Sequence, residues 1–291
     1  MFEGVGTALI TPFRDDGSFD EGAFERFVDW QIAEGVNFLV PCGTTGENPA
    51  LTPEEHRRVV ELTVNVANGR VPVLAGAGSN NTARAVELAR LAADLGADGI
   101  LTITPYYNKP TPDGLLRHFG AQAEALEAVR PGFPMILYNV PGRTGLNMTA
   151  ETTLRIAREI PSVAGVKEAS ANMEQILAII RGRREGFLVL SGDDAWTLPL
   201  LGAGANGVIS VASNEVPRLM RQLVDTRDVA LQNRLLPLLV GNFIESNPIP
   251  VKAAMKMMGI LDNDAVRPPL APITDANRQK LAAILQECGL A

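Results

Sequence analysis

The chain has 291 residues, of which 46% are hydrophobic, so it is long enough to bury a large core as one α/β domain or two smaller domains. Its net charge of −7 at pH 7 includes no block of like charge, which argues against nucleic acid or an anionic membrane surface as a partner. The first residues do not resemble a signal peptide, and the long uncharged stretch 195–214 is interrupted by proline and glycine. Because the two cysteines are also far apart in sequence, we expect a cytoplasmic protein without a disulfide.

Short apolar runs alternate with segments of helical periodicity from the start of the chain to about residue 214. The runs begin near Gly4, Val36, Val71, Gly99, Met135, Val163, Phe187 and Gly207. The helical segments include 53–67, 82–95, 114–129 and 150–160. Thr52 and Thr149 stand where helix N-caps are expected. Eight strands that alternate with helices predict an α/β fold closed into a (β/α)8 TIM barrel, with an open doubly wound sheet as the alternative.

After Asn214 the pattern changes to helical segments alone, at 217–223, 228–244, 250–258 and 275–288. A barrel of this type uses about 250 residues, which leaves room for a helical addition at the C-terminus. We therefore predict two regions. The first is a catalytic barrel over residues 1–225, and the second is a C-terminal helical region over residues 226–291 that packs on the barrel.

Polar residues follow several of the predicted strands. They occupy the segments 43–47, 104–108, 138–145 and 191–194, and Lys167 ends the sixth strand. Catalytic groups of such barrels lie at the C-terminal ends of the strands and in the loops that follow them. The sequence therefore predicts that these polar groups converge at one rim of the barrel.

Lys167 is the most informative of these residues, because it closes a short apolar strand in a chain with few lysines. Burial disfavours the charged ammonium and lowers the pKa of a lysine. A neutral amine can attack a ketone and form a Schiff base. The alternative is a strand-end lysine whose charge lies in solvent.

Three further features of the rim suggest acid–base chemistry and the binding of a carboxylate. The loop 43–47 offers two hydroxyls and backbone amides between glycines, although it could be only a turn from strand to helix. All three tyrosines of the chain, Tyr106, Tyr107 and Tyr138, fall in rim segments, which favours proton transfer over core packing. The planar guanidinium of Arg143 offers two parallel N–H donors for a carboxylate. The alternative is a solvated arginine in a loop.

Other apparent motifs do not predict a site. The glycine pattern of residues 202–207 is expected to be a turn before the eighth strand, because no helix follows it. Asp193 and Asp194 are expected to cap a helix start. With only two histidines and no cluster of ligands, we expect no metal. Cys42 is expected to be a small buried residue beside a glycine turn.

The motifs taken together are similar to those of a known family. The segments 4–8, 247–252 and 272–275 extend the likeness over nearly the whole chain. The chain resembles the pyruvate-dependent class I aldolases and lyases, a superfamily that includes N-acetylneuraminate lyase and forms Schiff bases. Residues 43–47 and Lys167 are shared widely in it. The motifs at residues 104–108 and 138–145 are shared by fewer members of the superfamily, and they are similar to those of the dihydrodipicolinate synthase family.

The resemblance implies a reaction and a set of site residues. The reaction is the condensation of pyruvate with L-aspartate 4-semialdehyde to 4-hydroxy-tetrahydrodipicolinate, in diaminopimelate and lysine biosynthesis. The implied catalytic residues are Lys167, Tyr138, Thr44 and Tyr107. The implied substrate-binding residues are Thr45, Arg143, Gly192 and Ile209. No cofactor is implied, because the iminium ion accepts the electron pair.

Each of these residues has an implied role. Lys167 forms the imine, and Thr44 and Thr45 hold the carboxylate of pyruvate. Tyr138, together with Thr44 and Tyr107, transfers protons. Two further roles follow from the same resemblance: Arg143 holds the semialdehyde, and the carbonyls of Gly192 and Ile209 orient the lysine.

The resemblance also concerns assembly and regulation. It implies a homotetramer of two tight dimers in which Tyr107 reaches the site of the neighbouring subunit. It further implies weak or absent inhibition by lysine, because Arg84 and Pro53 replace a glutamate and a histidine that lysine-sensitive members have. Two other functions stay open: a sister lyase acting on a keto-deoxy sugar acid, which would not need Arg143, and a barrel that only binds a small acid.

Overall fold

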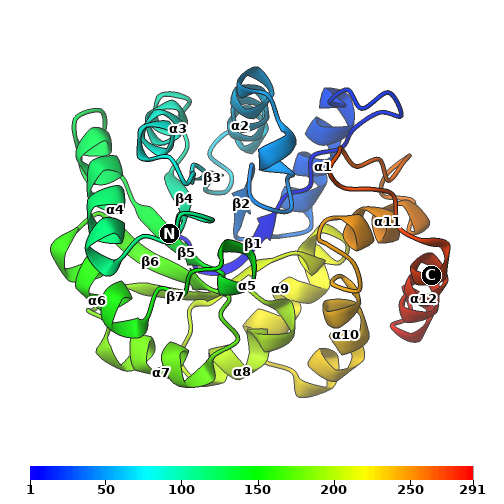
Figure 1. Cartoon of the computed structure of the whole chain (residues 1–291). Helices are drawn as coiled ribbons and strands as arrows, with labels where there is room; N and C mark the ends of the chain where they lie inside the picture. The colour runs from blue at the N-terminus through cyan, green and yellow to red at the C-terminus, as the bar shows by residue number, and fades with distance from the viewer. Residues whose placement is uncertain (291) are drawn as a thin grey trace.

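The computed structural model describes residues 1–290, in which eight parallel strands form a barrel (Figure 1). The strands are β1 (Gly4–Ala8), β2 (Phe38–Val40), β3 (Leu74–Gly76), β4 (Gly99–Ile103), β5 (Met135–Asn139), β6 (Val163–Glu168), β7 (Leu188–Ser191) and β8 (Gly207–Ser210). Their order is β2-β1-β8-β7-β6-β5-β4-β3, and a parallel bridge between Leu39 and Val73 closes the ring. The predicted (β/α)8 barrel is therefore confirmed. Within the segment 202–207, residues 203–206 form the turn between α8 (Thr197–Gly202) and β8, as predicted.

Helices cover the outside of the barrel (Figure 1). They are α1 (Glu21–Ala33), α2 (Pro53–Ala67), α3 (Thr82–Asp94), α4 (Pro112–Glu127), α6 (Ala150–Glu159), α7 (Met173–Gly182), α8 (Thr197–Gly202) and α9 (Pro217–Thr226). Thr52 forms a capping box with Glu55 and Thr149 caps α6, as the sequence predicts. Helix α4 begins two residues before its predicted start, because Thr111 caps it and proline is accommodated in the first turn.

The interior of the barrel is filled by side chains, as is usual for this fold. At the N-terminal end the rings of Phe2 and Phe38 meet edge to face, with centroids 5.6 Å apart. Gly6 leaves the space for Phe38, because a Cβ atom at Gly6 would lie 2.1 Å from the phenylalanine ring. This plug closes one end of the barrel, so a substrate can enter only from the end where the strands terminate.

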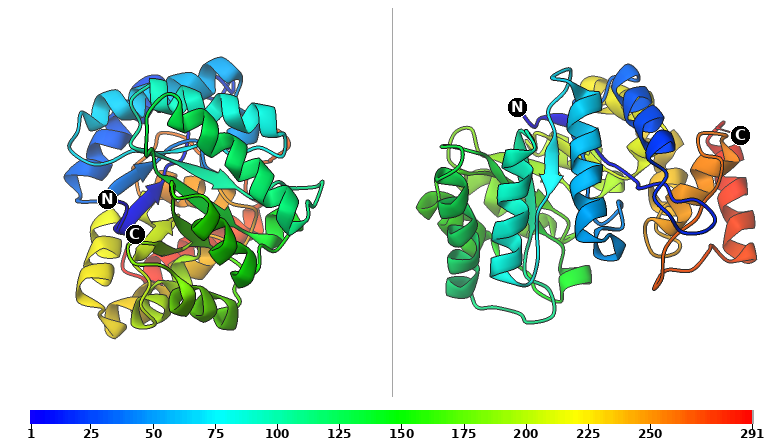
Figure 2. Two further views of the ribbon diagram at one scale, coloured as in Figure 1. Left: turned by 90° about the vertical axis from the view of Figure 1, so that its left-hand side faces the viewer. Right: turned by 90° about the horizontal axis from the view of Figure 1, so that it is seen from above.

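Three further helices follow the barrel: α10 (Val229–Gly241), α11 (Ile249–Met257) and α12 (Asp275–Glu287). They lie together at one side of the barrel, at the right of Figure 1 and of the right-hand view in Figure 2. One cluster of buried apolar side chains joins Val5 and Val208 of the barrel to Leu235 of α10 and Leu281 of α12. The C-terminal helices therefore share a core with the barrel. Among residues 1–290, no helix has both the length and the hydropathy required to cross a membrane.

Candidate active site

Lys167 and Tyr138 lie side by side at the ends of neighbouring strands. They are register partners of β6 and β5, so their side chains project from the same face of the sheet. Lys167 Nζ lies 4.3 Å from the centroid of the Tyr138 ring. Both residues are buried, with 6% and 7% of their surface exposed. The structure thus brings together the two residues that the sequence places at the centre of the site.

The surroundings of Lys167 prepare its amine for nucleophilic attack. Burial, the largest effect, and the positive charge of Arg143 lower the pKa of Lys167, whereas the carboxylate of Asp194 raises it. The net result is a pKa of about 8, against an ordinary value of 10.5. A substantial fraction of the amine is therefore neutral at physiological pH.

A second buried lysine, Lys252, provides a useful contrast. Its pKa is also lowered to about 8, mainly by burial. Its ammonium forms an ion pair with Glu47 and donates a hydrogen bond of 2.9 Å to the carbonyl of Ala265. Within residues 1–290, by comparison, no carboxylate forms an ion pair with Lys167. Lys167 is therefore the better candidate nucleophile, because its nitrogen is not committed to a structural contact.

Thr44 and Tyr138, the neighbour of Lys167, line a small cavity. The cavity has a volume of about 130 Å³, and Tyr106 also lines it. Burial raises the pKa of Tyr138, while the charge of Arg143 and a hydrogen bond with the side chain of Thr44 lower it. A phenol that is linked to a hydroxyl next to a lysine can pass a proton to or from a group bound at that lysine.

The loop of residues 43–47 packs tightly on its neighbours. A Cβ atom at Gly76 would lie 2.2 Å from the carbonyl oxygen of Cys42, so only glycine allows this approach. Cys42 itself is buried, as predicted. Thr45 is also buried, and its hydroxyl oxygen accepts a hydrogen bond of 2.9 Å from Nδ2 of Asn247. The loop presents Thr44 to the cavity and anchors Thr45 against the C-terminal region.

Gly192 and Ile209 occupy different positions around the lysine. A Cβ atom at Gly192 would lie 3.1 Å from Cε of Lys167 and 2.7 Å from Cβ of Ala169, so the lysine stem runs directly past this glycine. Ile209 belongs to the apolar cluster that fills the barrel interior, as does Tyr138. That the carbonyls of Gly192 and Ile209 orient the lysine stays a prediction.

Arg143 and Tyr107 are exposed residues on the segments that follow β5 and β4. Arg143 is in the short helix α5 (Pro141–Thr144) that follows β5, and it is close enough to affect the pKa of both Lys167 and Tyr138. Tyr107 is 88% exposed, and Tyr106 rather than Tyr107 lines the cavity of its own chain. A role for Tyr107 in the site of another subunit also stays a prediction.

Asp194 is a residue of the site that the sequence reasoning missed. Asp193 caps the short helix 194–196, as expected, by accepting a hydrogen bond from the amide of Ala195. The same expectation is wrong for Asp194, whose Oδ2 accepts hydrogen bonds of 2.9 Å from the amides of Val211 and Ala212. Asp194 is buried, and its charge opposes the effect of burial on Lys167. The sequence signal for this role is the uncharged stretch 195–214 after Asp194. It offers no cation that could pair with the carboxylate.

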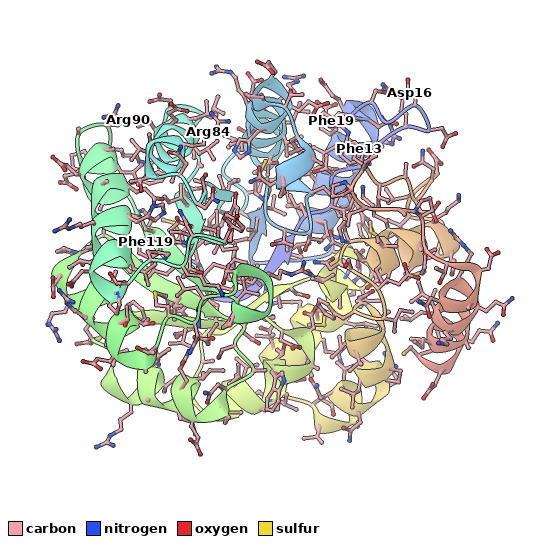
Figure 3. All side chains as sticks on the ribbon, in the orientation of Figure 1. Phe13, Asp16, Phe19, Arg84, Arg90 and Phe119 are labelled. Carbon is pink, nitrogen blue, oxygen red and sulfur yellow. The ribbon has the colours of Figure 1, made fainter. Side chains whose placement is uncertain are left out.

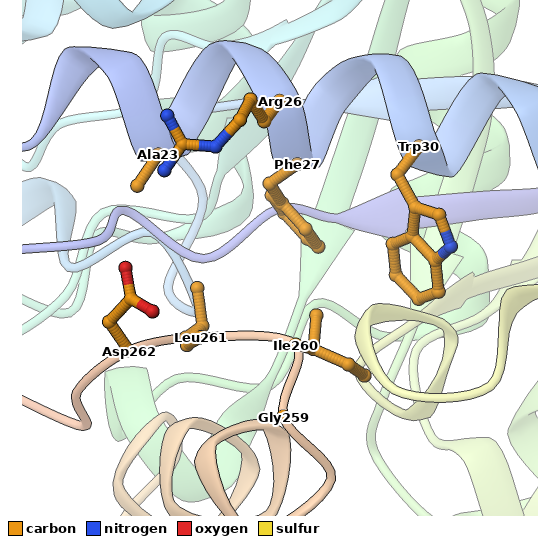
Figure 4. Close-up of a pocket in the computed structure, with 8 residues that line it drawn as sticks. All are labelled: Ala23, Arg26, Phe27, Trp30, Gly259, Ile260, Leu261 and Asp262. Carbon is orange, nitrogen blue, oxygen red and sulfur yellow. The ribbon is translucent and has the colours of Figure 1, made fainter.

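A second cavity, of about 340 Å³, lies between α1 and the loop that follows α11 (Figure 4). Phe27 and Trp30 point into it from α1, and Ile260 approaches from the opposite side. The residues that line it include none of the predicted site residues. The chemistry predicted from the sequence therefore belongs to the cavity beside Lys167.

The fold and this geometry define a barrel enzyme whose site is built around a buried lysine of lowered pKa. The model of the dihydrodipicolinate synthetase family matches residues 1–288, and the chain belongs to this family. It is 51% identical to the 4-hydroxy-tetrahydrodipicolinate synthase of Maridesulfovibrio salexigens, over 99% of each chain.

Solved structures agree with this assignment. The crystal structure of dihydrodipicolinate synthase from Thermotoga maritima is 41% identical and has a TM-score of 0.94 over 100% of both chains. A structure described as a monomeric dihydrodipicolinate synthase variant is 40% identical, with a TM-score of 0.94 over 100% of this chain and 98% of that one.

Proposed function

We propose that this protein is a 4-hydroxy-tetrahydrodipicolinate synthase, which condenses pyruvate with L-aspartate 4-semialdehyde in diaminopimelate and lysine biosynthesis. The observation that carries the proposal is the buried amine of Lys167 beside the phenol of Tyr138. Membership of the family supports the same conclusion.

In the proposed mechanism, the neutral amine of Lys167 attacks the keto carbon of pyruvate and water leaves, which forms an imine. Loss of a proton from the methyl carbon gives an enamine, and this carbon then attacks the aldehyde of the second substrate. The amino group of the semialdehyde finally attacks the imine carbon, which closes the ring and releases Lys167. Across the whole cycle two substrates give one product and one water, so no oxidant or reductant is needed.

The remaining residues support individual steps of this mechanism. The hydroxyls of Thr44 and Thr45 hold the pyruvate carboxylate. The position of Thr44 and Tyr138 on the same cavity, where the Thr44 hydroxyl lowers the pKa of Tyr138, supports a role of this pair in moving protons to and from the imine. The nearness of Arg143 to Lys167 and Tyr138, whose pKa values its charge lowers, supports its role in binding the carboxylate of the semialdehyde.

We also propose that the protein works in the cytoplasm, where pyruvate is a central metabolite, and that it forms a homotetramer of two tight dimers. The support for assembly is the exposure of Tyr106 (39%) and Tyr107 (88%) on one loop, since exposed aromatic side chains favour an interface. The similar structure of a monomeric variant makes the state of assembly a question for experiment.

The test of function is a substrate comparison. Purified protein is incubated with pyruvate and either L-aspartate 4-semialdehyde or an aldehyde derived from a sugar, and pyruvate consumption is followed. We expect rapid turnover with the semialdehyde alone. Preferred consumption of pyruvate with the aldehyde derived from a sugar would instead identify a sister lyase. A protein that neither turns over nor is trapped by borohydride with pyruvate would be only a binder of small acids.

A further inference from the structure

We infer that Lys252 is a positioning residue for the reaction, because its ion pair with Glu47 holds the loop 43–47 in the shape that binds the pyruvate carboxylate. The inference rests on the proposed function. It assigns the C-terminal region a part in substrate binding, although Lys252 lies outside the eight strands of the barrel.

Glu47 is held by the C-terminal region through both of its carboxylate oxygens. Oε1 forms the ion pair with Lys252, and Oε2 accepts a hydrogen bond of 2.9 Å from the backbone amide of Arg267. The side chains of Lys252 and Glu47 are only 1% and 2% exposed. A buried carboxylate is tolerated when it is paired and hydrogen-bonded in this way, and removal of one partner leaves an uncompensated charge.

The backbone of the loop depends on this anchor. Glu47 has a φ of 53°, in the left-handed region that residues other than glycine rarely adopt. Its amide donates a hydrogen bond of 3.1 Å to the carbonyl of Thr44, so the turn closes on a residue that faces the site cavity. A conformation of this kind persists only when its surroundings hold it, and here the surroundings are Lys252 and Arg267.

Asn247 provides a second contact between the same two regions. Its Nδ2 donates a hydrogen bond of 2.9 Å to the hydroxyl oxygen of Thr45. Because that oxygen already accepts a hydrogen bond from the protein, its own hydrogen remains available for a substrate carboxylate. Asn247 lies just before α11, the helix that carries Lys252, so one short segment contacts both Thr45 and Glu47.

We call the contacts of Lys252, Arg267 and Asn247 with the loop 43–47 the clamp. Its C-terminal side is itself fixed. Phe13 has Lys252 Nζ at 4.3 Å and the guanidinium of Arg267 at 4.2 Å from its ring centroid. Figure 3 shows Phe13 near the place where the N-terminal and C-terminal segments meet. Arg267 also donates two hydrogen bonds of 2.6 Å to Glu55 of α2. The lysine is therefore held on both sides, which suits a group that positions a loop.

The test uses two variants that weaken the clamp in different ways. Lys252→Met leaves Glu47 buried without its partner, and Asn247→Ala removes the contact to Thr45 while leaving the ion pair intact. We expect each to raise the KM for pyruvate about tenfold or more, with a matching loss of pyruvate-dependent trapping by borohydride. The KM for the semialdehyde should change less than about twofold, because its proposed contact, Arg143, lies in α5 and not in the loop 43–47.

Lys256→Met is the matched control. Lys256 lies one turn further along α11, and its side chain is 43% exposed in a 3.0 Å ion pair with Asp264. Its substitution should leave both KM values within about twofold of those of the wild type.

The outcomes separate the inference from the proposed function. Failure to trap the wild type with pyruvate would overturn the proposed function and the inference with it. A trapped wild type with an unchanged pyruvate KM in Asn247→Ala and Lys252→Met would overturn the inference alone. A purely structural role would give that second result, with a lower melting temperature as the only change. If Lys252→Met does not fold, the pyruvate KM of Glu47→Gln decides, because this variant removes the same ion pair without leaving a buried carboxylate unpaired.

Discussion

Two lysines of this chain are buried and have similar lowered pKa values, yet their neighbours give them different tasks. Lys252 faces a carboxylate and a carbonyl oxygen, so its ammonium is held in a structural contact. Lys167 lies against the ring of Tyr138, which lines the cavity together with Thr44. Burial alone therefore does not identify a nucleophilic lysine; the decisive property is whether its nitrogen is free to react.

The pH dependence of imine formation tests the state of Lys167. Burial disfavours the protonated form, so the pKa of about 8 lies below the ordinary 10.5 and the neutral amine accumulates as the pH rises towards 8. At low pyruvate concentration, we expect the rate of borohydride trapping to rise about tenfold from pH 6 to pH 7 and to level off above about pH 8. A rate that still rises steeply between about pH 9 and pH 10 would indicate an ordinary lysine.

The position of the label completes this test. Mass spectrometry should find the pyruvate-derived group on the peptide that contains Lys167, and Lys167→Ala should abolish trapping. A label on Lys252 or on one of the surface lysines would show that the wrong amine has been assigned.

Arg143 is predicted to act on the second substrate only. Arg143→Ala should leave trapping with pyruvate nearly intact and lower kcat/KM for the semialdehyde by about 30- to 1000-fold, because a charge-assisted contact is lost. Steady-state rates for both substrates provide the measurement. Arg158→Ala, at an exposed arginine of α6, is the control and should behave as the wild type. Unchanged turnover in Arg143→Ala would favour the alternative function, a sister lyase that acts on a keto-deoxy sugar acid.

At the scale of elements, the C-terminal helices are more than an addition to the barrel. We propose a division of the chain at residues 225 and 226, after the first of the helical segments that follow Asn214. However, Lys252 and Arg267 supply the partners of Glu47, and Leu235 and Leu281 complete an apolar core that includes β1 and β8. The two regions should therefore fold together and not separately.

A fragment of residues 1–225 tests this coupling. It should fail to unfold cooperatively and should bind a hydrophobic dye, because the apolar face of β1, β8 and α9 is uncovered and Glu47 lacks its cation. Thermal unfolding followed by circular dichroism, compared with the full chain, provides the measurement. A sharp transition together with pyruvate-dependent trapping would mean that the barrel is autonomous.

At the scale of the whole molecule, the main question is whether one chain contains a complete site. Tyr107 is predicted to act in the site of the neighbouring subunit. If so, mixing Lys167→Ala with Tyr107→Phe should restore activity, because each mixed dimer then contains one site with both an intact lysine and an intact tyrosine. Random exchange should give about a quarter of the wild-type activity.

Two measurements control the mixing experiment. Each variant alone should be nearly inactive, and sedimentation should show at least a dimer at assay concentrations. If Tyr107 acted within its own chain, no mixture would regain activity. A fully active monomer would contradict the proposed assembly.

Weak inhibition by lysine is predicted from the charge of Arg84, which lies on α3 (Figure 3). Burial and, to a smaller extent, the charge of Arg84 lower the pKa of His56 to about 4, so the arginine faces the region where the resemblance puts a lysine site. Arg84 also forms a 3.0 Å ion pair with Glu87. A cationic ligand would meet a like charge there and bind poorly.

The measurement is an initial rate with about 1–10 mM lysine at subsaturating pyruvate, for which we expect less than half inhibition. Arg84→Glu should increase sensitivity, because it replaces repulsion by attraction. Arg90→Glu makes the same change of charge at an exposed arginine of the same helix and should have no such effect. Strong inhibition of the wild type would show that another group accepts the ammonium.

The sequence by itself determined the barrel, because strands buried on both faces read as apolar runs and each amphipathic helix needs a sheet to cover. The same periodicity placed Lys167, Tyr138 and Thr44 at one rim, since parallel strands all end on the same side. Only the tertiary structure decided the contacts of Asp194 and Lys252. The partners of Asp194 are the amides of a different strand end, and the partner of Lys252 lies 205 residues away. Electrostatic effects depend on burial and on distances between side chains, and both exist only after distant segments have packed.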